Sequence, residues 1–405
     1  MSDSLDSRYS WTRLFLSLGL ATVGNAGMWS VIVVLPALQA DFGGGRGDAS
    51  LPYTLTMIGF ALGNLLIGRA VDRFGVARAL AGAALVSGAG YVAAALSPSM
   101  LLLSVAQGII GFGTAAFFGP LIADVSLWFR RRRGIAVAIV ASGNYLAGAI
   151  WPVLLSGVLT DQGWRAVYFV LAVLVVAVIL PGSTLLRHRL PDSSLTAEAQ
   201  ATSLTPRRVP FSPAVLMWML AAAGVACCVA MSMPQVHIVA LAVDLGLGQA
   251  VGAQILAVML LGGVVSRLVS GLIADRLGGV ATLLIGSVGQ MIGLMLYLPA
   301  DGQTSLTVVS LIFGLSQGGI VPAYAIIVRE YMPAKEAGTR VGFVIMATIL
   351  GMALGGWMSG WIYDMTGSYS LAFVNGILWN AANIAIMLVI LFSGRRRKTP
   401  LAATV

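Results

Sequence analysis

Charged residues are scarce in this sequence, and their scarcity excludes a large class of proteins. Only 10% of the 405 residues are Asp, Glu, Lys or Arg, while 58% are hydrophobic. Soluble domains carry about 25% charged residues, so the composition excludes a soluble globular protein. It instead predicts an all-α polytopic membrane protein, because a helix satisfies its own backbone hydrogen bonds inside a bilayer.

Cysteine, histidine and catalytic motifs are also lacking. The two cysteines, Cys227 and Cys228, are neighbours in an apolar run, where we expect them to pack as small side chains. The histidines are His188 and His237, and the sequence has no Gly-x-Ser-x-Gly, His-Glu-x-x-His, phosphate-binding loop or paired carboxylates. We therefore expect neither an enzyme nor a bound metal or cofactor.

The basic residues are distributed unevenly along the chain. The net charge is +9, and most Arg and Lys residues lie in alternate loops and the two tails, as in the runs Arg130–Arg133 and Arg395–Lys398. The opposite loops hold little beyond Arg46 and Arg165. Such asymmetry marks cytoplasmic loops, so it predicts an inner (plasma) membrane protein with both termini in the cytoplasm. The same distribution argues against a nucleic-acid partner, because the basic residues are spread over the loops of one side. We expect lipid and a small substrate as partners. We expect the chain to be a monomer.

Twelve apolar segments can be recognised, and a polar stretch divides them into two sets of six. The segments cover residues 12–38, 50–70, 79–97, 100–128, 134–159, 165–185, 212–240, 248–274, 279–299, 304–329, 338–363 and 370–393. Residues 187–210 are rich in Ser, Thr, Pro and Arg, which predicts a cytoplasmic linker. The expected units are an N-terminal six-helix half, residues 1–186, and a C-terminal six-helix half, residues 211–405, with a basic tail.

The two halves repeat one another in sequence. Gly68-Arg-Ala-Val-Asp-Arg-Phe-Gly75 matches Gly271-Leu-Ile-Ala-Asp-Arg-Leu-Gly278 at an offset of 271 − 68 = 203 residues, and Pro120 matches Pro322 at an offset of 322 − 120 = 202. Parallel repeats of this kind are typical of transporters that bind their substrate between the halves, near the middle of the membrane. The repeat therefore predicts two pseudo-symmetric halves and a central site.

Arg267 is the strongest candidate for that site. It lies inside the apolar run 251–274, which is long enough to cross a bilayer. A charge at such a depth costs from roughly 3 to more than 10 kcal/mol, so it usually has a function. Arginine suits a carboxylate because its planar fork donates two parallel hydrogen bonds. The alternatives are a buried ion pair, for which Asp275 is close in sequence, or a side chain that reaches back to the membrane surface.

Other polar and aromatic residues of the apolar segments are candidates for the walls of the same site. Asn25 and Trp29 are one helical turn apart and share a face. The remaining candidates are Tyr145, His237, Gln317 and Tyr324. His237 follows Pro234 and is also a candidate proton carrier, because histidine titrates near neutral pH. For each candidate the alternative is a hydrogen bond between helices or simple packing.

The repeated motif resembles the signature loop of the major facilitator superfamily. In that family the glycines allow close helix approach and the Asp-Arg pair braces the cytoplasmic gate. The resemblance implies twelve transmembrane helices in two halves, and it implies a gating role for two pairs of residues. These pairs are Asp72 with Arg73 and Asp275 with Arg276.

A finer resemblance concerns the monocarboxylate and oxalate/formate carriers. The stretch from Val125 to Gly143 is similar to their W-F-x-R-R-G-x-A…S-G motif, and Arg267 falls where that group has its carboxylate-binding arginine. Two departures matter: Gly263 stands where the animal proton-coupled carriers have an aspartate, and the run 342–356 lacks the lysine of the oxalate exchangers. A small monovalent organic anion, moved by proton symport or by anion exchange, is the expected substrate.

A drug or metabolite efflux pump of the same superfamily is the alternative. Such pumps usually carry an arginine three residues before a Gln-Gly pair in the fourth span. Here the pair is Gln107-Gly108, but the earlier position is Ser104. Arg267 would also repel a cationic drug, so the alternative ranks second.

Overall fold

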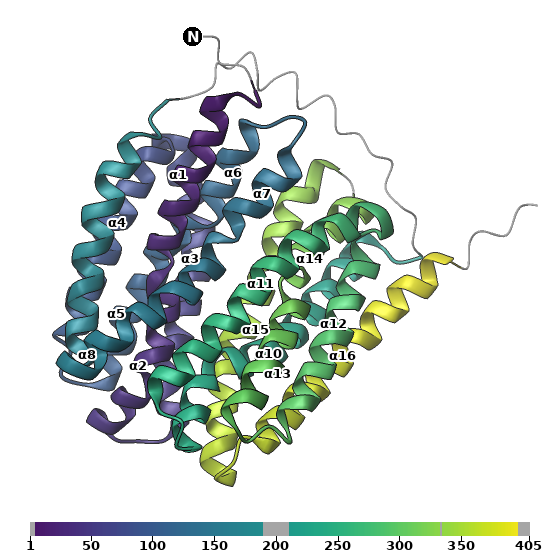
Figure 1. The fold of residues 1–405 in the computed structure, drawn as a ribbon. Coiled ribbons are helices and arrows are strands. Elements are labelled where there is room, and N and C mark those ends of the chain that lie inside the picture. The colour runs from purple at the N-terminus through teal and green to yellow at the C-terminus, as the bar shows by residue number, and fades with distance from the viewer. Residues whose placement is uncertain (1–4, 189–209, 333, 396–405) are drawn as a thin grey trace, which may run out of the picture.

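The computed structural model describes residues 5–188, 210–332 and 334–395, and within these ranges the chain forms helices and no strand (Figure 1). The predicted linker therefore lies mostly outside the described residues. The helices before it are α1 (Arg8–Gly24), α2 (Ala26–Phe42), α3 (Arg46–Phe74), α4 (Val76–Ala95), α5 (Met100–Thr114), η1 (Ala115–Phe117), α6 (Gly119–Leu127), α7 (Arg133–Ala141) and α8 (Gly143–Thr184). The helices after it are α10 (Pro213–Asp244), α11 (Gln249–Leu277), α12 (Gly279–Tyr297), α13 (Gln303–Gln317), α14 (Ile320–Tyr331), α15 (Ala334–Thr366) and α16 (Ser370–Arg395).

These helices cross the membrane twelve times. Eleven helical stretches of the described chain are long and apolar enough to span a bilayer. One of them, Arg133–Thr184, has 52 residues and would measure about 78 Å as a straight helix, more than twice the thickness of a hydrocarbon core. The chain turns back inside this stretch at Gly163, whose φ of 82° and ψ of 175° only glycine adopts readily. The predicted twelve-helix all-α fold is confirmed.

The two faces of the helix bundle differ in charge. We call the face that carries Arg73, Arg130–Arg133 and Arg276 the basic face; it lies at the top of Figure 1, where α1 begins and where α3 and α11 end. The face that carries Arg46 and Arg165 is called the opposite face. The sequence predicts that the basic face is the cytoplasmic one.

The sequence repeat extends to the packing of helices. A Cβ atom added to Gly111 on α5 would lie 2.0 Å from the backbone oxygen of Thr56 on α3. A Cβ atom added to Gly314 on α13 would lie 2.0 Å from the backbone oxygen of Met259 on α11. Both members of this contact recur at the same offset, since 314 − 111 = 203 and 259 − 56 = 203. The two halves thus use glycine at equivalent positions to bring equivalent helices into backbone contact.

Replacing Gly314 by alanine is expected to destabilise the protein. The added methyl group would meet backbone that cannot rotate away, and overpacking of this kind costs about 1–3 kcal/mol. The matched control is Gly82→Ala on α4, where nothing lies within 4 Å and where alanine favours the helix. Thermal unfolding in detergent should show a lower Tm for Gly314→Ala alone. Equal Tm values for the two variants would contradict the close helix contact.

Four of the crossings are interrupted part-way through the membrane. The breaks lie at Asn25 between α1 and α2, at η1 and Phe118 between α5 and α6, at Ser142 between α7 and α8, and at Gly318–Gly319 between α13 and α14. Two of these breaks precede the repeated prolines, whose missing N–H and bulky ring interrupt a helix. Interrupted helices leave backbone carbonyls without helical partners, which is how many transporters build a binding site inside the membrane.

The halves are joined on the opposite face. Arg46 at the start of α3 forms an ion pair with Asp244 at the end of α10, and the Thr54 hydroxyl donates to the Ala353 carbonyl oxygen on α15. The hydrogen bonds and ion pairs that join described residues of the two halves all lie between the opposite face and the level of Arg267. The described structure is therefore the conformation closed at the opposite face.

Candidate substrate site

Arg267 lies at the boundary between the halves. Its side chain is on α11, and the residue is 8% exposed. The Nη1 atom donates to the carbonyl oxygen of Ala141 at 2.6 Å, and the Nε atom donates to the carbonyl oxygen of Gly318 at 3.2 Å. Ala141 belongs to the N-terminal half and Gly318 to the C-terminal half, so the guanidinium connects the two.

Both of these carbonyls are available because of helix breaks. Ala141 is the last residue of α7, and the last carbonyls of a helix have no intrahelical partner. Gly318 lies four residues before Pro322, which has no N–H to donate to it. Arg267 and Pro322 were both noted in the sequence. The sequence did not indicate that Pro322 leaves the Gly318 carbonyl oxygen free to accept a hydrogen bond from Arg267.

Arg267 has no acidic partner among the described residues. The ion pairs described within the chain involve other residues, and Asp275 is exposed and forms no bond with Arg267. A guanidinium carries five N–H donors, and carbonyl oxygens use two of them here. The Nη2 atom has no described hydrogen bond and is not among the enclosed atoms that lack one, so it faces accessible space. The three donors on Nη1 and Nη2 that the carbonyls leave are bonded to no carbonyl or carboxylate among the described residues, and the Tyr145 side chain is their near neighbour.

An aromatic ring of the N-terminal half, that of Tyr145, lies against the Arg267 guanidinium. The guanidinium carbon of Arg267 lies 4.3 Å from the centre of the Tyr145 ring, a cation–π distance. A Cβ atom at Gly263 would lie 3.0 Å from that ring, so Tyr145 occupies the space into which an aspartate at position 263 would project. Trp29 packs beside Tyr145 with ring centres 6.3 Å apart. The indole N–H of Trp29 is buried and has no described partner.

Asn25 holds three of the helix breaks together. Its Nδ2 atom donates to the carbonyl oxygens of Ala21 at 2.8 Å and Phe117 at 3.2 Å, and its Oδ1 atom accepts from Asn144 at 3.0 Å. These bonds connect the first, fourth and fifth crossings next to Tyr145. Asn25 therefore braces the site, and its side-chain atoms are already engaged.

A pair of glutamines lies beside the Gly318 break. The Nε2 atom of Gln235 on α10 donates to the Oε1 atom of Gln317 at 2.7 Å. The other amide atoms of the pair, Gln235 Oε1 and Gln317 Nε2, are buried without a described partner. Gln317 immediately precedes Gly318, so one unused donor and one unused acceptor lie next to the residue that binds Arg267.

Two sequence-predicted site residues have their polar atoms occupied elsewhere in the C-terminal half. The Tyr324 hydroxyl donates to Asn383 Oδ1 at 2.9 Å. His237 is fully buried; its Nε2 atom lies 2.8 Å from the Gly356 carbonyl oxygen and its Nδ1 atom 3.1 Å from the Tyr369 hydroxyl. The carbonyl can only accept, so Nε2 carries the proton. The structure does not bring these polar groups to Arg267, and a proton-carrying role for His237 stays a prediction.

The predicted gate residues lie at the basic-face ends of α3 and α11. Asp72, Arg73, Asp275 and Arg276 are all exposed, and no hydrogen bond or ion pair is described for them. Arg73 lies over the ring of Phe74 at 5.2 Å. A gate whose charged pairs are unengaged fits a conformation that is open on this face.

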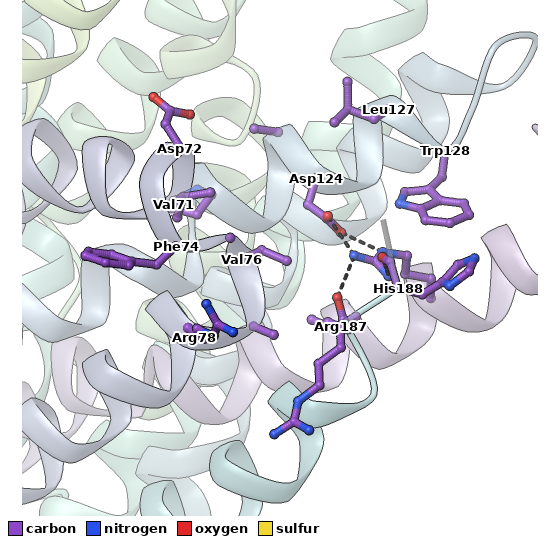
Figure 2. Close-up of a pocket in the computed structure, with 16 residues that line it drawn as sticks. Val71, Asp72, Phe74, Val76, Arg78, Asp124, Leu127, Trp128, Arg187 and His188 are labelled. Atoms are coloured by element: carbon purple, nitrogen blue, oxygen red, sulfur yellow. Dashed lines mark hydrogen bonds and ion pairs between the residues drawn. The ribbon is translucent and has the colours of Figure 1, made fainter. Parts of the chain in front are cut away.

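A pocket of about 820 Å³ lies beside the first gate loop, between the N-terminal half and the start of the linker (Figure 2). Asp72, Arg78, Asp124, Arg187 and His188 contribute to its lining. The Asp124 carboxylate accepts two hydrogen bonds of 2.8 Å, one from Nε and one from Nη2 of Arg13. Arg13 belongs to α1 and is only 3% exposed. Because none of its lining residues belongs to the Arg267 site, we associate this pocket with the gate.

Comparison with known proteins agrees with this architecture. The Major Facilitator Superfamily matches the chain over residues 15–313 and 238–404. Monocarboxylate transporter 13 of Bos taurus is 27% identical over 80% of this chain and 75% of its own length. Monocarboxylate transporter 11 of Homo sapiens is 28% identical over 70% and 62%, and MFS transporter asaE of Aspergillus flavus is 26% identical over 72% and 65%. With its twelve crossings, repeated gate loop and resemblance to the monocarboxylate transporters, the chain belongs to the Major Facilitator Superfamily and is a multi-pass membrane transporter.

Proposed function

We propose that this transporter moves a small organic anion with one carboxylate across the membrane by alternating access. The observation that carries the proposal is the state of Arg267. It is a buried positive charge between the halves, without an acidic partner among the described residues, and three of its N–H donors are bonded to no described carbonyl or carboxylate. A carboxylate supplies the missing charge and the missing acceptors at once. One arginine neutralises one carboxylate, so a monocarboxylate fits better than a dicarboxylate.

The geometry around Arg267 suggests how the anion is held. Nη1 and Nη2 can donate together to the two oxygens of a carboxylate, while Nε and the second hydrogen of Nη1 stay on the carbonyls of Gly318 and Ala141. The organic part of the substrate then meets the rings of Tyr145 and Trp29. The unused amide atoms of Gln235 and Gln317 are available for a hydroxyl or keto group.

Substrate binding would control the movement of the halves through the same arginine. Enclosing an unpaired charge between two apolar surfaces is costly, whereas enclosing a hydrogen-bonded ion pair is less so. An occupied site can therefore close on the basic face, where Asp72, Arg73, Asp275 and Arg276 would engage neighbouring helix ends. The coupling is proton symport or anion exchange, and we propose a monomer in a cell inner membrane with both termini in the cytoplasm.

Among the relatives, the monocarboxylate transporters support this proposal, because they are 27% and 28% identical to this chain over 80% and 70% of its length. The second candidate function is a drug or metabolite efflux pump. It is favoured by the fungal MFS transporters among the relatives. An efflux pump would differ from an anion carrier in two ways: its net flux would be outward, and its substrate would be larger or cationic.

A transport assay in proteoliposomes separates the two candidates. We expect saturable uptake of at least one of pyruvate, lactate and acetate, weaker uptake of oxalate, and no uptake of tetraphenylphosphonium, because Arg267 repels a cation. Liposomes without protein are the control. Uptake of the cation together with no uptake of any carboxylate would contradict the proposal and favour the efflux pump.

A further inference from the structure

A second arginine lies between the halves, at the opposite face. Arg46 is the first residue of α3 and is only 7% exposed. Its Nη2 atom is bonded to the Asp244 carboxylate of the C-terminal half. Its Nε and Nη1 atoms are buried and have no described hydrogen-bond acceptor, although both are strong donors; the guanidinium carbon lies 5.3 Å from the centre of the Tyr363 ring. Burying donors without acceptors is costly, so these two atoms mark a site that is only partly filled.

The backbone around Arg46 also binds an anion. The N–H groups of Arg46 and Gly47 donate to the two carboxylate oxygens of Asp364 at 2.6 and 2.8 Å. These N–H groups belong to the first turn of α3, where unpaired donors and the helix dipole favour negative charge. One small region of the N-terminal half therefore holds two carboxylates, and Asp244 and Asp364 both come from the other half.

Alternating access would remove both carboxylates from this region. When the halves separate at the opposite face, Asp244 and Asp364 move away with α10 and α15. The Arg46 guanidinium and the free N–H groups of α3 then line the opening with no anion bound. The same guanidinium and N–H groups bind carboxylates in the closed conformation, so the carboxylate of a substrate is a suitable ligand for them in the open one.

We propose that Arg46 and the first turn of α3 form a second substrate-binding site, which the carboxylate of the transported anion occupies in competition with Asp244 and Asp364. This inference rests on the proposed function. Binding there captures the anion at the opposite face before it reaches Arg267. The same competition links substrate to the gate, because a bound anion keeps the two aspartates from re-forming the closed contact.

The competition gives two variants opposite effects. Asp244→Asn removes a competing carboxylate, so the KM measured from the opposite face should fall about fivefold or more. Arg46→Gln removes the site itself, so the same KM should rise by a similar factor. If Arg46 only latched the gate, both variants would open it and shift KM in the same direction. Asp364→Asn should lower this KM as Asp244→Asn does. Arg46→Lys keeps the charge but lacks the planar fork, so it should raise the KM, and it keeps the test valid if Arg46→Gln folds poorly.

The measurement is uptake of radiolabelled pyruvate, lactate and acetate by intact cells and by inside-out vesicles, which report the two faces separately. Arg165→Gln is the matched control: it removes a positive charge from the same face, where Arg165 is 48% exposed and paired with Asp41 within the N-terminal half. Its KM should match the wild type. Equal directions for Asp244→Asn and Arg46→Gln would overturn this inference alone, whereas a wild type that moves none of the three acids would contradict the proposed function as well.

Discussion

Replacing Arg267 by glutamine is expected to reduce transport at least about a hundredfold while leaving the protein folded. Truncating one partner of a buried, hydrogen-bonded charge pair costs about 2–5 kcal/mol, and about 2.7 kcal/mol corresponds to a hundredfold. The empty protein should not suffer, because glutamine removes a buried charge that lacks an acidic partner among the described residues. Uptake of pyruvate and thermal unfolding without substrate measure the two effects separately.

Arg267→Lys should recover little of the lost transport. An ammonium keeps the charge but lacks the planar fork that donates to Ala141, Gly318 and a carboxylate at the same time. A structural role for Arg267 predicts a different outcome, in which both variants lower the Tm of the empty protein. If Arg267→Gln transported the anion at the wild-type rate, the proposed function would lose its basis.

A disulfide across the opposite face is expected to stop transport completely and reversibly. A Cβ atom at Gly45 would lie 2.6 Å from Cγ of Asp364 in the other half. Asp364 Oδ1, the third nearest atom, lies 2.9 Å from this Cβ position, and Cγ and Cβ are about 1.5 Å apart, so cysteines at 45 and 364 would place their Cβ atoms between about 2.9 and 4.1 Å apart. This interval overlaps the range of about 3.5–4.5 Å that a disulfide needs. The bond would hold the halves together at this face, so the site could no longer open to it.

Oxidation of the Gly45→Cys/Asp364→Cys variant should abolish uptake, and a reducing agent should restore it. The two single variants, treated in the same way, control for the loss of the Asp364 contact. The native Cys227 and Cys228 are buried and free, so they should not compete for the new cysteines. Continued transport by the oxidised double variant would show that the halves do not need to separate at this face.

Much of the fold could be predicted from the sequence, because its signals are local. Apolar runs define the crossings, and the motifs at Gly68 and Gly271 give the repeat that the helix contacts of Gly111 and Gly314 then reproduce. Arg267 stood out because a charge inside an apolar run is costly wherever the chain folds. Pro322 stood out because it aligns with Pro120 in the repeat, at an offset of 202 residues.

Long-range partners could not be predicted in the same way. Arg46 looked like a loop residue, and only the approach of α10 and α15 buries it. His237 lies on α10, which is apolar all round, so the sequence does not indicate which side turns toward a neighbour and which toward the site. Tyr324 lies on the buried side of α14, but its hydroxyl partner Asn383 is 59 residues away in sequence. The acceptors of Arg267 are backbone atoms, which no residue type reveals.

The measurement that tests the central claim most directly is a thermal-shift series of the purified protein with small carboxylates, run in parallel on Arg267→Gln. A ligand that binds only the folded state stabilises it by about 2.7 kcal/mol at a hundred times its Kd, which raises the Tm. A carboxylate that raises the Tm of the wild type and leaves that of Arg267→Gln unchanged is the predicted result. Equal shifts for both proteins would contradict it, because the anion would then bind without the arginine.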